Sequence, residues 1–212
     1  AMSLPSVFIV GAGGFGREVW NWLSTHPDHG VRWKIHGFLD DARNALNAYQ
    51  YPVGVVDSAT THRPEHSALY VCALGSPKVK ERVCTTLRNA GARFLTVVHP
   101  SALIGRNVKI GEGSVICPGA IVTADVQLGA FVTLNCRSGI GHDVEVGDFC
   151  TLSAFCDVTG HAKLGRGVFM GTHAAVLPNK LVGDYAVIGA GAIVMSKVPA
   201  GATLYTPPSK IL

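Results

Sequence analysis

Residues 134–158, LNCRSGIGHDVEVGDFCTLSAFCDV, carry an aliphatic side chain at every sixth position. The same spacing runs without a gap or a change of register from residue 98 to residue 194 and gives 17 aliphatic positions. A second series, four residues further on, holds only Ala, Val, Ser or Cys, with Lys180 as its one exception. Nine of the 17 aliphatic residues are followed directly by Gly.

A period of six matches neither an α-helix nor simple strand alternation, so the chain must turn a corner within every hexad. Fixed short periods of this kind are typical of solenoids. The repeats predict a triangular parallel β-helix with three short strands per coil and between five and six coils, stacked about 4.8 Å apart. We expect the aliphatic residues to point inward at the corners, small residues to fill the space beside them, and glycines near the corners to supply unusual backbone angles.

Composition limits the possible functions. Of the 212 residues, 48% are hydrophobic, which is ample for a buried core. Charged residues make up only 15%, the net charge is +4 and no Lys/Arg cluster occurs, so neither nucleic acid nor an anionic membrane is indicated as a partner. No apolar run approaches the roughly 20 residues that span a bilayer. Six cysteines without CxxC spacing and no signal peptide pattern predict reduced thiols in a cytoplasmic protein.

The first 97 residues alternate strands and helices. Apolar stretches at 6–10, 34–39 and 69–74 predict strands, and helical patterns follow the first and third of them. Ser76 stands as the N-cap of a helix over 77–89, and a further strand at 93–97 leads into the repeats. This βαβ alternation predicts a parallel sheet.

The loop GAGGFG at 11–16 lies between the first strand and its helix and completes the pattern GxGxxG. Such a loop brings backbone N–H groups and a helix N-terminus up to a phosphate, and an acid at the end of the second strand suits a ribose or a base. So short a domain makes about half of a dinucleotide fold, which favours one nucleotide diphosphate; NAD binding and a purely structural glycine turn stay open as alternatives. The predicted substrate contacts are Gly11, Gly13, Gly14, Phe15, Asp40, Asp41, Gly75 and Ser76.

The motifs GAGGFGRE, FLDD, LGSPKVKERV, VVHPSA, GHDV and the terminal PPSKIL, together with the hexapeptide array, carry a family resemblance. The chain resembles the sugar O-acyltransferases of the sialic acid O-acetyltransferase type from Val7 to Leu212. That group includes bacterial N-acetyltransferases of nucleotide-linked 4-amino-4,6-dideoxy sugars. The resemblance implies an α/β, half-Rossmann-like N-terminal domain over residues 1–97, followed by an all-β left-handed parallel β-helix over residues 98–212.

The resemblance also implies a homotrimer with acetyl-CoA in the groove between neighbouring subunits. The N-terminal domain would hold the nucleotide sugar and present its amine or hydroxyl to that groove. In the amino-sugar members, a His followed by an acidic residue serves as the base.

His142 stands two places after the inward Ile140, so its side chain should project from the coil. Acetyl transfer from a thioester requires the attacking amine or hydroxyl to lose a proton, and an imidazole can accept it near neutral pH. Asp143 would fix the tautomer of the ring. A solvent-facing His142 without a role, and an Asp143 that only serves a turn, are the alternatives.

Further site residues follow from the spacing and the resemblance. Gly160 lies 18 residues after His142, so its N–H could stabilise the thioester oxygen, although a corner glycine is an equal alternative. Asn135 matches a substrate-contacting Asn of the amino-sugar group, or belongs to an asparagine ladder. The chain departs from the group at Gly141, where many members have Glu, and at Thr151, where many have a second His. The expected cofactor contacts are Thr151, Gly160, His161, Thr172 and Ala190.

No metal is expected. A zinc site like that of γ-type carbonic anhydrases, which have a similar architecture, needs two ligands five residues apart and a third two coils away. His142, His161 and His173 are instead separated by 19 and 12 residues.

The sequence therefore favours an acetyl-CoA-dependent N-acetyltransferase acting on a nucleotide-linked amino sugar by direct transfer in a ternary complex. An O-acetyltransferase of the same family, a non-catalytic nucleotide-binding trimer and an NAD-linked protein are the alternatives. The nucleotide base, the sugar, the acetylated atom and the pathway stay open.

Overall fold

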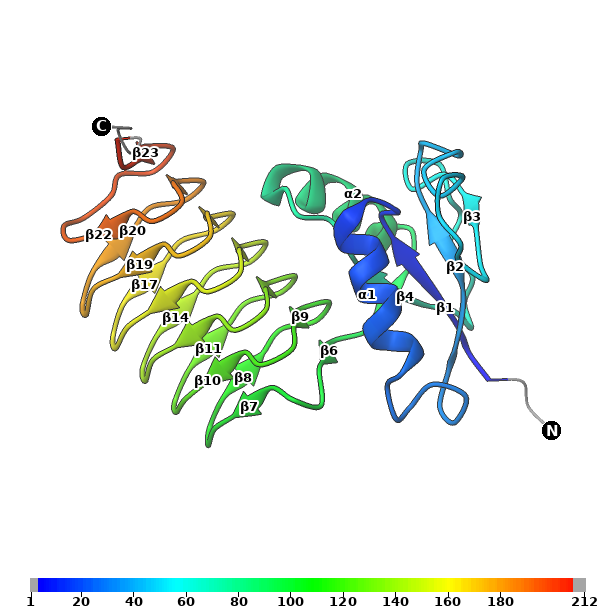
Figure 1. Cartoon of the computed structure of the whole chain (residues 1–212), viewed down its shortest axis with the longest axis horizontal. Coiled ribbons are helices and arrows are strands. Elements are labelled where there is room, and N and C mark those ends of the chain that lie inside the picture. Colours follow the sequence, from blue (N-terminus) through cyan, green and yellow to red (C-terminus); the bar gives the residue numbers. More distant parts are fainter. Residues whose placement is uncertain (1–3, 208–212) are drawn as a thin grey trace. The chain divides into compact units, whose positions relative to one another are not determined.

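The computed structural model describes residues 4–207 and divides the chain into two compact units, Ala1–Val97 and Val98–Leu212 (Figure 1). Of the terminal motif PPSKIL, all but Pro207 lies outside the described residues. Within the described part, neither helix has the length and apolar character needed to cross a bilayer.

The N-terminal unit is a five-stranded parallel sheet in the order β3-β2-β1-β4-β5. The strand β1 lies at its centre, and four of its five residues are buried. Helix α1 turns Val19 and Leu23 into the core, and α2 turns Val83 and Leu87 inward. The elements are β1 (Ser6–Val10), α1 (Gly14–Ser24), β2 (Lys34–Leu39), β3 (Val55–Asp57), β4 (Leu69–Cys72), α2 (Pro77–Asn89) and β5 (Arg93–Phe94).

Three details of this unit differ from the sequence prediction. The strand expected over 93–97 is split, because β5 pairs with β4 in this sheet whereas β6 (Val97–Val98) already belongs to a solenoid sheet. The three-residue edge strand β3 is too short to leave a pattern in the sequence. Ser76 does occupy the N-cap position of α2, but its side chain makes no capping hydrogen bond.

The second unit is a parallel β-solenoid, as predicted, built from two-residue strands in three sheets. We name the sheets face I, face II and face III in the order in which the chain visits them after β6. Face I contains β7 (Leu103–Ile104), β10 (Ile121–Val122), β13 (Gly139–Ile140), β16 (Asp157–Val158), β19 (Ala175–Val176) and β22 (Ile193–Val194). Face II contains β8 (Lys109–Ile110), β11 (Gln127–Leu128), β14 (Glu145–Val146), β17 (Lys163–Leu164) and β20 (Leu181–Val182). Face III contains β6, β9 (Val115–Ile116), β12 (Thr133–Leu134), β15 (Thr151–Leu152), β18 (Phe169–Met170), β21 (Val187–Ile188) and β23 (Thr203–Leu204).

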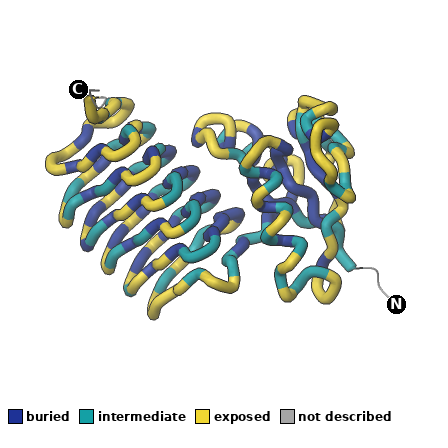
Figure 2. Tube along the Cα trace, in the orientation of Figure 1, coloured by how far each residue is buried: buried dark blue, intermediate teal, exposed yellow. Residues whose placement is uncertain are grey.

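The register between coils is 18 residues throughout the repeats. Ile140, for example, pairs with Val122 in the coil before it and with Val158 in the coil after it. The aliphatic series forms the solenoid core together with the small-residue series, and most members of both are less than 5% exposed. Buried and exposed residues therefore alternate along every coil (Figure 2).

The corners are built differently from the prediction. Each aliphatic residue is the second residue of a strand and not a corner residue. From Ile104 to Ile188, the backbone takes a left-handed conformation three residues after each of them, as at Asn107 (φ 59°) and Phe131 (φ 56°). The glycine directly after the aliphatic residue meets a different requirement. A Cβ added at Gly147 would lie 2.6 Å from the backbone of the next coil, so close stacking of coils requires glycine there.

Candidate functional site

His142 lies at the corner between faces I and II, on the turn from β13 to β14. Its side chain is 62% exposed, which agrees with the expectation that it projects from the coil. Its Nδ1 is 2.8 Å from Oδ2 of Asp143. Because Nδ1–H donates to this carboxylate, the other ring nitrogen, Nε2, is left as a proton acceptor.

Asp143 is the left-handed residue of that turn (φ 59°), and His161 holds the same left-handed position one coil later (φ 59°). The two side chains are therefore stacked along one corner. Nε2 of His161 lies 3.7 Å from the same Oδ2 atom of Asp143. The rings of His142 and His161 also pack edge to face, with centroids 5.1 Å apart and planes at 86°.

Gly160 lies directly beneath the ring of His142. A Cβ added at Gly160 would be 2.6 Å from Cε1 and 2.7 Å from Nε2 of that ring, so any side chain there would displace it. The Gly160 carbonyl accepts a hydrogen bond from Asn179, whereas its buried N–H has no assigned acceptor among residues 4–207. The backbone of Gly160 thus lies next to the imidazole.

The three side chains at this corner also satisfy a geometric criterion for cation binding. Ligand atoms of His142, Asp143 and His161 all lie within 4.8 Å of one another, so the group could hold a divalent cation. The spacing of the histidines in the sequence did not predict this group, because its two imidazoles are one coil apart and its third ligand is a carboxylate that lies between them. His173 is not part of the group, since it stacks on Phe155 at a different corner.

Other predicted residues lie elsewhere on the solenoid. Asn135, Thr172 and Ala190 are at the corner between faces III and I, and Thr151 is in β15 of face III. The Asn135 side chain accepts a hydrogen bond from the Cys136 N–H (2.7 Å), so it bonds to its own neighbour and forms no ladder. Within a single chain, these residues are not brought together with His142.

Two of those side chains are distinguished by their hydrogen bonding. Thr172 Oγ1 donates to the Ala154 carbonyl (2.8 Å), which ties two coils together. Thr151 is 5% exposed, and its hydroxyl has no hydrogen-bond partner in the described part of the chain.

In the N-terminal unit, the predicted substrate residues meet at the carboxyl edge of the sheet. Gly11, Asp40 and Gly75 follow β1, β2 and β4, which are adjacent parallel strands. The Gly11 N–H donates to the Leu39 carbonyl (2.8 Å). Gly11 is left-handed (φ 103°), and a Cβ there would lie 2.8 Å from the Ala73 carbonyl oxygen, so this position requires glycine.

The two aspartates at the end of β2 have different partners. Asp40 accepts hydrogen bonds from the N–H groups of Ala12 and Ala42 (2.8 Å each), so it fixes the glycine loop. Asp41 accepts from the hydroxyls of Ser58 and Thr60, and these bonds hold the pKa of its carboxyl below the ordinary value.

The start of α1 is open to an anion. Gly13 and Gly14 provide no side-chain cap, and no acidic residue stands in the first turn. Sequence reasoning missed Arg17, whose guanidinium stacks on Tyr49 with Cζ 3.6 Å from the ring centroid. The sequence signal for Arg17 was its position directly after the glycine motif. Side chains in the first turn of a helix point back toward the helix N-terminus, so an arginine there lies close to the glycine loop.

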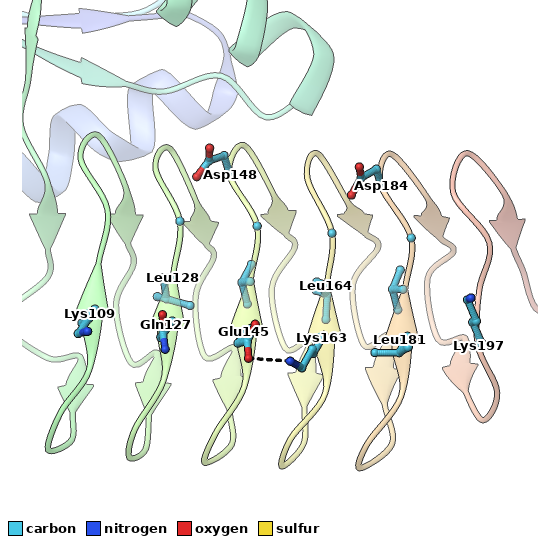
Figure 3. Close-up of a pocket in the computed structure, with 16 residues that line it drawn as sticks. Lys109, Gln127, Leu128, Glu145, Asp148, Lys163, Leu164, Leu181, Asp184 and Lys197 are labelled. Atoms are coloured by element: carbon cyan, nitrogen blue, oxygen red, sulfur yellow. Dashed lines mark ion pairs between the residues drawn. The ribbon is translucent and has the colours of Figure 1, made fainter.

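A shallow groove runs along face II between Lys109 and Lys197 (Figure 3). Four of its charged residues make contacts between coils. Glu145 pairs with Lys163 at 2.8 Å. Asp148 and Asp184 each accept from a backbone N–H one coil earlier (2.8 Å). None of the predicted site residues lines this groove, so we assign it no role in the chemistry.

Comparison with known families gives a match in the N-terminal unit. Residues 6–87 match the PglD N-terminal domain family. This range contains the glycine loop, both aspartates and the start of α2.

Curated relatives extend the match into the solenoid. UDP-N-acetylbacillosamine N-acetyltransferase of Bacillus subtilis is 29% identical over 117 residues, which is 53% of this chain and 51% of the relative. Serine acetyltransferase of Buchnera aphidicola is 32% identical over 123 residues, 57% of this chain and 39% of the relative. The chain thus spans about half of the length of these two relatives or less. GDP-perosamine N-acetyltransferase of Escherichia coli O157:H7 is 26% identical over 222 residues, covering 99% of this chain and 96% of the relative.

The chain is thus similar to two N-acetyltransferases of nucleotide-linked sugars, and to one of them from end to end. Solved structures extend this similarity to the fold. WeeI from Acinetobacter baumannii has a TM-score of 0.81 at 26% identity and covers 99% of this chain and 100% of its own. PerB from Caulobacter crescentus, solved in complex with CoA and GDP-perosamine, has a TM-score of 0.85 at 24% identity, covering 100% of this chain and 99% of its own.

Proposed function

We propose that the protein transfers the acetyl group of acetyl-CoA to the amino group of a nucleotide-linked amino-dideoxy sugar. The observation that carries this proposal is the His142–Asp143 pair, 2.8 Å apart and seated on Gly160. Its support is the end-to-end similarity to a GDP-perosamine N-acetyltransferase.

The residues around His142 suit a direct transfer. The amine attacks the thioester carbonyl while Nε2 of His142 takes its proton, and Asp143 holds the ring in the tautomer that leaves Nε2 free. The N–H of Gly160 would donate to the carbonyl oxygen as negative charge develops there. The thiolate of CoA then leaves, and no acyl-enzyme forms.

The N-terminal unit would bind the nucleotide sugar. Its glycine loop offers backbone N–H groups at an uncapped helix start, and Arg17 adds a positive charge for the diphosphate. Since Asp40 already bonds to the loop through both oxygens, its main role in binding would be to hold that loop in shape. The nucleotide base and the sugar would be bound by other groups at the same edge of the sheet.

A complete site would need a second copy of the chain. In one copy, His142 is 62% exposed, whereas acetyl transfer requires a site from which water is excluded. Thr172 and Ala190, two of the five expected acetyl-CoA contacts, lie at another corner of the solenoid. In a trimer, the corner of one copy that carries Thr172 and Ala190 would face His142 of the next copy. The two copies would then close the groove between them.

The test measures CoA release from acetyl-CoA with UDP-, GDP- and dTDP-linked 4-amino-4,6-dideoxy sugars. Each acceptor is compared with its 4-hydroxy analogue. We expect release with an amino sugar only; release with the hydroxyl analogue would favour O-acetylation, and no release with any acceptor would favour a non-catalytic scaffold.

The first prediction concerns the base. His142→Ala should lower turnover at least about a hundredfold, because the attacking amine loses its proton acceptor. The expected oligomeric state is unchanged. Near-normal turnover in this variant would rule out His142 as the base.

A further inference from the structure

We propose that His161 is a positioning residue that acts through Asp143: it holds the carboxylate in the orientation that fixes the imidazole of His142. This inference rests on the proposed function of His142 as the base. It gives His161 a different role from the acetyl-CoA contact expected from the sequence.

The contacts of His161 support this role. Its Nε2 lies 3.7 Å from Oδ2 of Asp143, the same atom that accepts from Nδ1 of His142 at 2.8 Å. A distance of 3.7 Å is too long for a direct hydrogen bond but close enough for electrostatic attraction or a bridging water. The Asp143 carboxylate therefore lies between two imidazoles and is restrained by both.

The backbone holds the three residues in this arrangement. The N–H of His161 donates to the carbonyl of His142 at 3.0 Å, which fixes the spacing of the two coils at this point. The 18-residue register places His161 over Asp143, and both have a left-handed backbone. The edge-to-face contact with the His142 ring adds a second restraint on the base itself.

Exposure explains why Asp143 needs such a partner. The side chains of Asp143 and His161 are 45% and 56% exposed, so neither is held by a surrounding core. An exposed carboxylate on a turn can rotate away from His142, because water can replace the hydrogen bond that it loses. A second group at the same oxygen restricts this rotation.

A double-mutant cycle in acetyl transfer tests the proposal, with chelator present so that no bound cation contributes. The variants are His161→Asn, Asp143→Asn and both together; Asn is chosen because it tolerates a left-handed backbone. Asn107→Ala is the control. It changes the same corner position two coils before Asp143, where φ is 59°, and strains the backbone at least as much.

We expect His161→Asn to lower kcat at least about threefold, with the acetyl-CoA KM unchanged, and to have no further effect in the Asp143→Asn background. An equal loss in both backgrounds, or a loss confined to the acetyl-CoA KM, would overturn the proposal in favour of an independent cofactor contact. The control should retain full kcat.

A readout without catalysis separates this proposal from the proposed function. Nitrogen chemical shifts of His142 report the fraction of the ring protonated at Nδ1, and we expect His161→Asn to lower that fraction even if no acceptor sugar is ever found. An unchanged tautomer fraction contradicts the positioning role. Full activity of His142→Ala would instead contradict the base assignment.

Discussion

Asp143 occupies a left-handed backbone conformation (φ 59°) that most residues adopt only at a cost. The turn repeats at each corner from residue 107 to residue 191, so residues as bulky as Phe131 and Tyr185 also take it. Asp is among the residues that tolerate it best, and the conformation directs its carboxylate along the corner toward the next coil. At the residue scale, two properties therefore favour Asp at position 143: its tolerance of the left-handed backbone and its ability to accept a hydrogen bond from His142.

Gly160 gives the prediction that belongs to this scale. Gly160→Ala should lower kcat about a hundredfold, because the new methyl group occupies the place of the His142 ring and a displacement of about 1 Å is enough for such a loss. Steady-state kinetics measure it. Gly54→Ala is the control, since a Cβ there meets nothing within 4 Å. Equal kinetics in both variants would show that the ring does not need the space above Gly160.

The sequence was sufficient to predict that His142 projects from the coil, because the position of the inward Ile140 fixes which way it points. It was not sufficient to pair Asp143 with His161. That contact depends on which residue of the turn is left-handed, and the hexad pattern does not specify it. Arg17 was missed for a related reason, since its partner Tyr49 lies in an irregular segment.

At the scale of elements, the glycine loop and α1 are held to the end of β2 by one side chain. Asp40 bonds to Ala12 in the loop and to Ala42 after the strand. The sequence predicted the elements that surround this edge, but it did not predict the hydrogen bond between the loop and Asp40, because this bond appears only when the sheet order is known.

We expect Asp40→Ala to raise the KM for the nucleotide sugar about tenfold and to change kcat less, because the loop is proposed to bind a part of the substrate remote from the reacting amine. Initial rates at varied concentrations of each substrate measure this. Asp184→Ala is matched to it, since Asp184 bonds to the backbone N–H of Arg166 in the same way (2.8 Å) but lies in the solenoid. A change only in the acetyl-CoA KM would contradict the division of binding between the two units.

At the scale of the whole molecule, the predicted site residues are distributed over two units and over two corners of the solenoid. The fold class could be predicted from the hexads, because few other structures have a six-residue period. The number of copies that assemble could not be predicted in the same way, because it depends on surfaces that would meet only between copies.

Sedimentation equilibrium of the purified chain should give three times the chain mass of 22.3 kDa. His142→Ala should sediment in the same way, since that side chain lies on a turn outside the core. A monomer that retains full acetyl transfer would show that the site needs no second copy.

The 18-residue register has a consequence for how the length of this chain can change. Loss or gain of one whole coil returns every later residue to the face it had before, so the solenoid can be shortened or extended beyond His161 while His142 keeps its surroundings. Loss of a single hexad between Asp143 and His161 is different. The core pattern survives it, yet all later turns move to the next side of the solenoid, and His161 no longer lies over Asp143. The fold therefore tolerates changes in chain length of six residues, whereas the arrangement of the site tolerates only changes of eighteen residues.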